Sequence, residues 1–516
     1  MSAAERRALT RLLLLVLSVY LLSMAGRMTS GDGETVYQTT RALVTRRQLS
    51  VSRRPETAIG RSGRAYGKYG LGQSIVQAPF LVAGELVGSA FGAGDDRPAR
   101  FAVGAANSVV STALVGLFWL TARRLGASQR DASIGSLALA FCTLVWPYAR
   151  SDFSEPLQSL LLLLVFFATL RWRAAPSLGW AVAIGAAAGA AILTKAASAV
   201  VLAPLGLYVL FASRQHRSLG MPRLARHAVA AALPLLASLA FQAALNLYRF
   251  GRVTEFGYGS EPAEGFTTPL LRGVGYLLLS SGKGLFLFTP PVLLALALLV
   301  PLARRLPAEA ATIAGVFLAE LLYFARWWAW HGDWAWGPRY MVPTVPFLML
   351  TWPLAGDMWR RTAWLRAFGT ALAGAGFCVS ILGVVVDYGA YYSVVGSQLG
   401  KGVDVQEARL VPEFSPLLGH AWLLRAAWHD TIARWRDPAH DARDNPARDA
   451  YPWAARYPDL VPEAPERAYG FDLWFVALNG RTRFAEYWSW LAAAWLALAA
   501  ARLAQPRVVL AAAWPR

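Results

Sequence analysis

Two acidic residues stand one residue apart directly after the first apolar stretch of the chain, which covers residues 9–27. They are Asp32 and Glu34, in the segment Ser30-Gly31-Asp32-Gly33-Glu34. A carboxylate at such a position can take a proton from an attacking hydroxyl as a general base, and two carboxylates can also hold a hard divalent metal ion. A flexible turn with solvated carboxylates, or an N-cap for a helix that begins near Thr35, explains the same pattern.

A glycine-rich basic segment follows at residues 63–72, with the sequence Gly-Arg-Ala-Tyr-Gly-Lys-Tyr-Gly-Leu-Gly. Glycines allow the backbone to approach another group closely, and Arg64 and Lys68 can neutralise a phosphate. Tyr66 and Tyr69 flank Lys68 and are candidate substrate-binding residues. The alternative is a surface turn whose basic side chains touch lipid headgroups.

The third segment that can carry chemistry is a tryptophan-rich loop at residues 327–340, which holds five Trp. An aromatic belt at the membrane interface is the simplest interpretation. The alternative is a wall facing a sugar or a lipid, with Trp334, His331 and Asp333 as substrate-binding candidates. Arg339 then contacts a phosphate, because its planar guanidinium is always charged and can bind in a bidentate manner. A structural hydrogen bond is a better interpretation of His331 than a metal ligand.

The elements that must position these groups are membrane helices. The 516 residues are 56% hydrophobic and 16% charged, whereas soluble domains carry about 25% charge. The two Cys lie in apolar runs, which excludes a disulfide scaffold and a Cys-based metal site. The net charge of +19 fits anchoring to anionic lipid, and the scattered Arg residues argue against nucleic-acid binding.

The hydropathy pattern predicts an all-α polytopic membrane protein, because a spanning helix needs about 20 mostly apolar residues. We expect a bundle of about twelve transmembrane helices with juxtamembrane helices on the outer face. The membrane domain covers residues 1–386, including an outer loop at 28–100, and residues 486–516 form the last span and a cytoplasmic tail. The predicted spans are 9–27, 101–122, 132–149, 155–171, 180–194, 196–212, 227–248, 285–303, 308–327, 341–355, 366–386 and 486–504.

The segment 71–93 decides the topology. It is apolar but contains Pro79 and Glu85. Counting it as a span reverses the predicted membrane orientation of every later segment. If it lies at the membrane surface, the predicted cytoplasmic loops hold fourteen basic residues and the short outer loops eight. The positive-inside rule therefore favours a surface helix and cytoplasmic termini.

With this topology, uncommon polar groups gather on the outer side. The chain has only four Lys, and Lys68, Lys195, Lys283 and Lys401 all fall there. Tyr258, which lies between two glycines after a predicted helix end, joins them as a further substrate-binding candidate. The outer region 387–485 is rich in Pro and Trp, and apolar residues three and four apart predict an interfacial helix near 416–436. This region would cover the site or act as an acceptor-binding lid.

The order of these motifs resembles the GT-C membrane glycosyltransferases, in the bacterial protein-mannosyltransferase-like branch. The resemblance rests on the early acidic motif, on the Tyr-Gly-Lys-Tyr-Gly turn that leads into an apolar surface helix, and on later fragments spread over most of the chain. These fragments are Ser154-Glu155-Pro156, Leu193-Thr194-Lys195, Asn246 to Gly251 with Gly257-Tyr258, Gly282-Lys283-Gly284-Leu285, Gly337-Pro338-Arg339-Tyr340 and Ser415 to His420.

The resemblance implies transfer of a hexosyl or pentosyl group from a polyprenyl-phosphate donor to a glycan, lipid or protein acceptor. The reaction would serve the cell envelope on the outer face of a bacterial plasma membrane. The family's essential acid maps onto Asp32, with Glu34 second, and a divalent metal would be held by these two if by any residue. The donor phosphate maps onto Lys68 and Arg339, with Arg64 as a neighbour and Lys195 and Lys283 as weaker candidates.

Two other classes of protein fit the hydropathy. A transporter or flippase of a lipid-linked sugar tends to show inverted repeats and ionisable groups at mid-membrane; the chain shows no convincing repeat, and only Lys195 has a depth that favours this class. A non-catalytic membrane scaffold explains the spans but not the collected acids and Lys. Neither a phosphate-binding Gly-x(4)-Gly-Lys-Ser/Thr motif nor a His-Glu-x-x-His zinc motif is present.

Overall fold

The computed structural model describes residues 1–259, 265–332, 334–398, 409–437, 450–461, 471–477 and 483–504. The fold is predominantly helical, as expected for an all-α membrane protein. One small sheet lies in the described part of the chain. Its strands β1 (Ser50–Val51), β2 (Thr57–Ile59) and β3 (Ala65–Gly67) are antiparallel in the order β1-β3-β2.

The first half of the chain contains the helices that build the predicted outer loop and the first part of the bundle. They are α1 (Ala3–Leu22), α2 (Gly31–Arg46), α3 (Leu71–Ala90), α4 (Arg97–Gly104), α5 (Ala106–Arg124), α6 (Gln129–Phe141), α7 (Val145–Ala149), α8 (Glu155–Ala174), α9 (Leu178–Thr194), α10 (Ser198–Arg214), the 3-10 turn η1 (Arg217–Leu219) and α11 (Met221–Phe250).

The second half completes the bundle and adds the C-terminal helices. They are α13 (Leu270–Leu279), α14 (Leu285–Phe288), α15 (Pro291–Ala297), α16 (Leu299–Arg305), α17 (Pro307–Arg326), the 3-10 helix η2 (Arg339–Thr344), α18 (Val345–Met349), α19 (Thr351–Leu354), α20 (Gly356–Arg361), α21 (Ala363–Val385), α22 (Tyr388–Gln398), η3 (Pro412–Phe414), α24 (Pro416–Arg436), α25 (Trp474–Ala477) and α26 (Arg483–Ala504).

Each of the twelve predicted spans coincides with helical structure, but the helices are less regular than the hydropathy suggests. Five described helices are long and apolar enough to cross a membrane, namely 97–124, α8, α11, α17 and α21. The predicted span 285–303 is divided into three short helices and 341–355 into a 3-10 helix and two short helices. Prolines at 290, 301, 343, 346 and 353 explain these breaks, because proline lacks the N–H that an uninterrupted helix requires.

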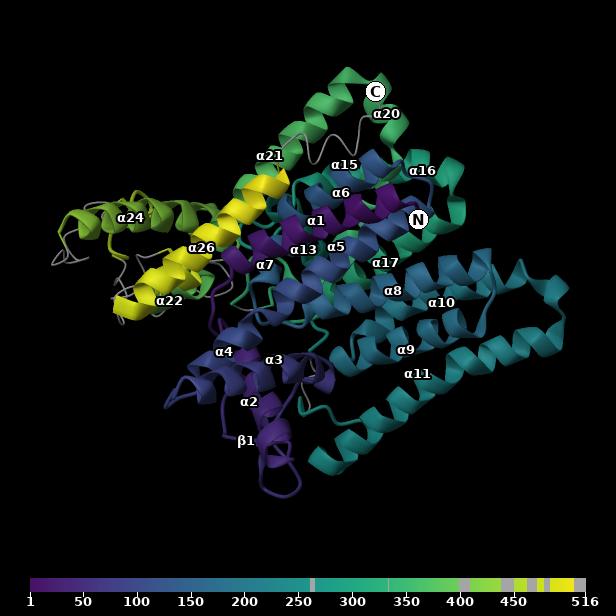
Figure 1. Ribbon diagram of the computed structural model, residues 1–516, viewed down its shortest axis with the longest axis horizontal. Helices are drawn as coiled ribbons and strands as arrows, with labels where there is room; N and C mark the ends of the chain where they lie inside the picture. The colour runs from purple at the N-terminus through teal and green to yellow at the C-terminus, as the bar shows by residue number, and fades with distance from the viewer. Residues whose placement is uncertain are drawn as a thin grey trace.

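Helix α3 is the segment on which the predicted topology depends, and it is not among the five candidate spans. It packs closely against α4. A Cβ at Gly84 would lie 2.5 Å from Cα of Ala99, and a Cβ at Gly88 would lie 3.2 Å from Cγ of Pro98. Figure 1 shows α2, α3, α4 and β1 together at one end of the bundle, whereas the N-terminus, α16 and α20 lie toward the other end. This arrangement agrees with a helix that lies beside the bundle end.

The apolar core joins residues far apart in the sequence. Its largest cluster includes buried side chains of α1, α5, α6, α8, α17 and α18. A second cluster packs α22 against α24 and includes Tyr391, Trp422 and Trp453. The helix expected near 416–436 is thus α24, and it is anchored by a small core of its own.

Candidate functional site

Asp32 lies in the first turn of α2 and is held by two side chains from distant parts of the chain. Its Oδ2 accepts a hydrogen bond from Nη1 of Arg339 at 2.8 Å, and its Oδ1 accepts one from the hydroxyl of Tyr69 at 2.5 Å. The side chains of Asp32 and Arg339 are 27% and 13% exposed. The structure therefore joins the first-loop acid, the Gly-rich turn and the Gly-Pro-Arg turn at one place.

The charges at this place keep Asp32 ionised. Burial favours the neutral acid, but the Arg339 guanidinium and the Tyr69 hydroxyl outweigh it, so that the pKa of Asp32 falls below its ordinary value of 3.8. Burial and the neighbouring carboxylate raise the pKa of Tyr69 well above its usual range. Tyr69 is therefore a fixed hydrogen-bond donor to a charged carboxylate.

Close backbone packing brings Tyr69 to Asp32. Strand β3 leads into the turn, and a Cβ at Gly70 would lie 2.1 Å from the carbonyl oxygen of Leu193 at the end of α9. A Cβ at Gly72 would likewise meet Oγ1 of Thr194 at 2.2 Å. From the end of α11, Arg249 donates to the carbonyl oxygens of Gly67 at 3.0 Å and Tyr69 at 3.3 Å. Glycine is thus required at these contacts, and the turn is fixed from two sides.

Arg339 reaches the site from the tryptophan-rich loop. Gly332, at φ +64°, lies where a Cβ would meet Cγ of Arg339 at 2.6 Å. The guanidinium carbon lies 4.9 Å from the centre of the Phe153 ring and 5.1 Å from that of Tyr340. These aromatic faces support the cation without neutralising it, and the buried Nε has no hydrogen-bond partner.

Lys195 is paired with a carboxylate close to Arg339. Its Nζ lies 2.7 Å from Oε1 of Glu155 and 4.6 Å from the centre of the Tyr340 ring. The Tyr340 ring stacks on Phe324 at 4.0 Å and lies within 5.1 Å of both cations. Lys195 thus belongs to the surroundings of the site, but Glu155 neutralises its charge.

Lys68 is the cation whose charge is available. It is half-buried, and its Nζ lies 5.7 Å from the centre of the Tyr258 ring. Within the described chain it forms no ion pair with a carboxylate. Gly257 lies against its Cγ, and Tyr69 follows it directly. Lys68 and Tyr258 therefore lie beside the Asp32–Tyr69 pair with an ammonium group that an anion can approach.

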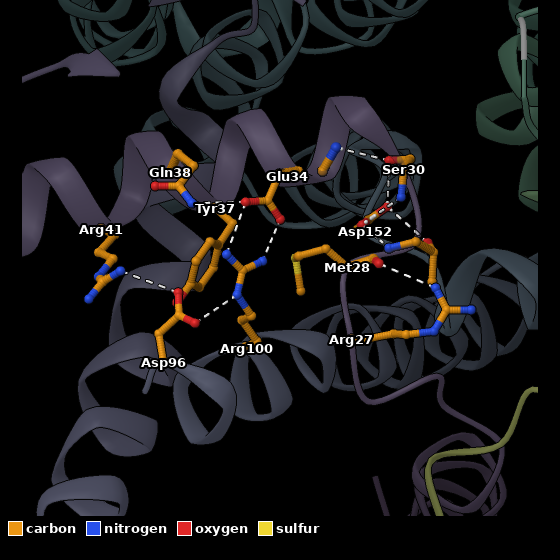
Figure 2. Close-up of polar contacts among 12 residues, drawn as sticks. Arg27, Met28, Ser30, Glu34, Tyr37, Gln38, Arg41, Asp96, Arg100 and Asp152 are labelled. Atoms are coloured by element: carbon orange, nitrogen blue, oxygen red, sulfur yellow. Dashed lines mark hydrogen bonds and ion pairs between the residues drawn. The ribbon is translucent and has the colours of Figure 1, made fainter. Parts of the chain in front are cut away.

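Glu34 has a different environment from Asp32. Figure 2 shows it directed at α4, where both of its oxygens contact the guanidinium of Arg100, which also binds Asp96. Gln38 donates to Glu34 at 2.8 Å. Asp32 and Glu34 therefore do not form a two-carboxylate ligand set, and the described residues contain no group of three His, Cys, Asp or Glu that could hold a metal. The residues present do not fit the metal site that the Asp-x-Glu motif suggested.

Asp152, which the sequence did not single out as a site residue, fixes the start of α2. Its two oxygens accept four hydrogen bonds, from the amides and hydroxyls of Thr29 and Ser30, at 2.6–3.2 Å (Figure 2). Burial raises the pKa of Asp152. A Cβ at Gly33 would lie 2.0 Å from Cγ of Asp152. Glycine thus separates the two acids because the carboxylate of Asp152 occupies the space beside it.

The other candidates lie outside this group. Arg64 is exposed, and the Tyr66 hydroxyl lies 3.2 Å from Oγ of Ser62. Lys283 is fully buried, and its Nζ donates to the carbonyl oxygen of Ala335 at 2.5 Å. Trp334 is 50% exposed.

Two candidates of the tryptophan-rich loop remain. Burial lowers the pKa of His331 to about 2, helped by the charges of Arg409, Lys283 and Arg339, so this imidazole is neutral. The structural hydrogen bond that we expected for His331 stays a prediction. Asp333 lies outside the described residues.

Comparisons with known proteins support the resemblance seen in the motifs. Residues 93–241 match the family model described as dolichyl-phosphate-mannose-protein mannosyltransferase. This range includes Asp152, Glu155 and Lys195 but neither Asp32 nor Arg339. No curated protein matches the chain significantly.

Solved structures are similar to this chain. The structure of ArnT from Cupriavidus metallidurans bound to undecaprenyl phosphate matches with a TM-score of 0.50 and 20% identity, over 80% of this chain and 73% of that one. The apo form of the same protein gives 0.48 and 18% over the same shares. The apo oligosaccharyltransferase of Archaeoglobus fulgidus gives 0.44 and 12%, over 80% and 60%. The resemblance to the GT-C membrane glycosyltransferases is confirmed at the level of fold.

Replacing Gly33 with Ala should destabilise the protein by about 2–3 kcal/mol, because the new methyl group overlaps the Asp152 carboxylate and displaces the start of α2. The measurement is the apparent Tm in detergent, followed by tryptophan fluorescence. Gly94→Ala is the matched control, since a Cβ there meets nothing within 4 Å, and it should change stability by less than about 0.5 kcal/mol. Equal Tm values for the two variants would contradict the assignment.

Proposed function

We propose that this protein is a membrane glycosyltransferase that moves a sugar from a polyprenyl-phosphate donor to an acceptor hydroxyl on the outer face of the membrane. The observation that carries the proposal is the contact between Asp32, Arg339 and Tyr69, which brings an ionised carboxylate together with a guanidinium and a hydroxyl. The match of residues 93–241 to a mannosyltransferase family model supports the same reaction class. The sugar is a hexose or a pentose.

The donor class follows from the cations and the fold. The ArnT structure that shares this fold was solved with undecaprenyl phosphate bound. In the present chain, Arg339 pairs with Asp32, and Lys68 directly precedes Tyr69, whose hydroxyl donates to the same carboxylate. A polyprenyl chain can lie along the apolar helices while its phosphate meets the two cations. Arg339 suits this role because a guanidinium binds phosphate oxygens in a bidentate manner.

Asp32 has the geometry of the base. Each of its oxygens has one partner, and an ionised carboxylate offers about four lone-pair positions. The exposed fraction of 27% leaves room for an acceptor hydroxyl. Tyr69 and Arg339 fix the carboxylate on two sides, so its free lone pairs point in a defined direction. Such positioning of a base contributes a large part of the rate in acid–base catalysis.

The reaction step involves one proton and one bond exchange. The acceptor oxygen forms a bond with the anomeric carbon as Asp32 removes its proton. The bond between the anomeric carbon and the phosphate oxygen breaks, and its electron pair stays on the lipid phosphate. Arg339 and Lys68 stabilise that growing negative charge, which is electrostatic stabilisation of a leaving group. Direct attack of this kind inverts the configuration at the anomeric carbon.

The ion pair of Asp32 and Arg339 also links donor binding to basicity. A donor phosphate that binds Arg339 competes with Asp32 for the same guanidinium. As the phosphate takes over that contact, Asp32 loses the largest favourable contribution to its low pKa and becomes a stronger base. Asp32 is thus weakly basic in the free enzyme and more basic once the donor is in place.

The cellular site follows from the predicted topology. In the short loops, the predicted cytoplasmic side holds fourteen basic residues and the outer side eight, and the positive-inside rule assigns the richer side to the cytoplasm. The Asp32 end then faces outward from a bacterial plasma membrane. Within the outer region expected at 387–485, the described helix α24 would cover the site or guide the acceptor, be it a glycan, a lipid or a protein. Membrane lipids surround the remaining helices, and no nucleic acid is involved.

Replacing Asp32 with Asn should reduce transfer by about 10³-fold, because the amide keeps the shape of the side chain but cannot accept the proton. The measurement is transfer in proteoliposomes supplied with a panel of polyprenyl-phosphate sugars, with the apparent Tm measured in parallel. Asp95→Asn, in an exposed surface pair with Arg97, is the matched control and should transfer at the wild-type rate. Wild-type transfer by Asp32→Asn would remove Asp32 from the role of base.

Replacing Tyr69 with Phe should raise the pKa of Asp32 above its wild-type value, since a hydrogen bond to the charged carboxylate is lost. The wild-type pKa lies below 3.8, so Asp32 stays ionised throughout the measurable range. In Tyr69→Phe the ratio of mutant to wild-type kcat/KM should fall as the pH decreases from 7 to about 4.5.

Tyr66→Phe is the matched control, because that hydroxyl contacts Ser62 and not Asp32. Its ratio to wild type should stay constant over the same pH range. A constant ratio for Tyr69→Phe as well would show that the Tyr69 hydroxyl has no influence on the protonation of the base.

A further inference from the structure

A cavity of about 280 Å³ is lined by four chain segments. Two of the helices that line it, α16 and α20, lie toward the bundle end away from α2 (Figure 1). The four segments are the turn after α5, the start of α6, the junction of α16 and α17, and the segment from α19 to α20. These segments all belong to the predicted cytoplasmic loops. The cavity is therefore remote from Asp32 and plays no part in the proposed transfer reaction.

The lining combines basic and apolar side chains. Arg123, Arg305 and Arg360 provide the positive charge, while Leu302 and Leu306 provide part of the apolar surface. This combination matches a molecule with a negatively charged head and an apolar body. Cavities of this kind between helices on the cytoplasmic side bind anionic lipid headgroups in other membrane proteins.

The three arginines differ in how far their charge is already used. Arg360 contacts Asp131 at 3.0 Å and Asp357 at 2.6 Å, and both acids line the cavity. Arg123 pairs with Glu5 at 2.5 Å. Arg305 is exposed and donates to the carbonyl oxygen of Leu354 at 3.3 Å, and it forms no ion pair in the described chain. Of the three lining arginines, Arg305 is thus the one whose charge is not paired with a carboxylate of the described chain.

The unneutralised charge extends beyond the lining. The described neighbours Arg124, Arg304 and Arg361 are adjacent in sequence to the three lining arginines and form no ion pair within the described chain. Arg123 has a buried Nε without a hydrogen-bond partner. The acids Asp131 and Asp357 are both bound by Arg360. The cavity therefore has a net positive surrounding, in which an anion is more favourable than a cation.

We propose that this cavity is a binding site for the phosphate headgroup of an anionic phospholipid of the inner leaflet. The phosphate contacts Arg305, and the acyl chains leave along the leucines of the α16–α17 junction. The bound lipid then connects the α5–α6 turn with α20, which stabilises the bundle at the end opposite the proposed active site.

The test measures lipid binding by the full-length protein in phosphatidylcholine nanodiscs that contain increasing phosphatidylglycerol. We expect a saturable rise in Tm for the wild type, as for any ligand that binds only the folded state. Arg305→Ala should raise the phosphatidylglycerol concentration for half-saturation about 10-fold, because a charged hydrogen-bond donor to phosphate is lost.

Arg226→Ala is the matched control, since Arg226 is exposed in the first turns of α11, on the same predicted face but outside the cavity. It should leave half-saturation unchanged. Equal losses in the two variants, or no saturable effect of phosphatidylglycerol, would overturn the proposal. Inorganic phosphate alone should give no rise in Tm in phosphatidylcholine; an equal rise would show an anion site that does not need the lipid.

Discussion

The ion pair between Asp32 and Arg339 joins residues that lie 307 positions apart, and the surrounding fold depends on keeping it in place. Two charges with exposed fractions of 27% and 13% are largely removed from water, which costs several kcal/mol per ion unless the geometry compensates. Compensation comes from the Tyr69 hydroxyl on one side and from the aromatic faces of Phe153 and Tyr340 on the other. The close glycine contacts at the α9 end serve the same purpose, because they alone allow Tyr69 to reach the carboxylate.

A second set of charges lies close to the N-terminal end of α2. Arg27 contacts both Asp387 and Asp472 at 2.8 Å, and Asp472 also binds Arg150 at 2.5 Å. The two arginines hold the pKa of Asp472 below its usual range despite its burial. This network connects the end of α1, the segment before α8 and the C-terminal segment 471–477. Asp152 stands two residues after Arg150, so this network lies next to the carboxylate that binds the residues before α2.

The sequence predicted the helices and the meeting of the motifs better than it predicted the roles of single side chains. Apolar content located α3 and apolar periodicity located α24, because both are local patterns. The position of α3 at the membrane surface stays a prediction. The partners of Glu34, Lys283 and Asp152 depend on tertiary contacts that no spacing encodes. Glutamate is a common metal-ligand residue, but both carboxylate oxygens of Glu34 contact Arg100 of α4. For Asp152, the signal in the sequence was Gly33 between the two acids. The structure explains this glycine, because the Asp152 carboxylate occupies the space that a side chain would need.

The difference between a structural cation and a substrate-binding cation in this fold lies in the partner rather than in burial alone. Lys283 and Arg249 donate to backbone carbonyls, which bear no net charge and remain bound to the cation whatever the substrate. An incoming phosphate would have to break those bonds and leave buried carbonyls unsatisfied. Arg339 instead pairs with the carboxylate of Asp32, which also accepts a hydrogen bond from Tyr69. A phosphate could therefore take the place of Asp32 at Arg339, while Asp32 keeps the hydrogen bond from Tyr69 and gains one from the acceptor. Such an exchange of one anion for another would conserve the local charge balance, and for this reason we propose Arg339, rather than a more exposed arginine, as the partner of the donor phosphate.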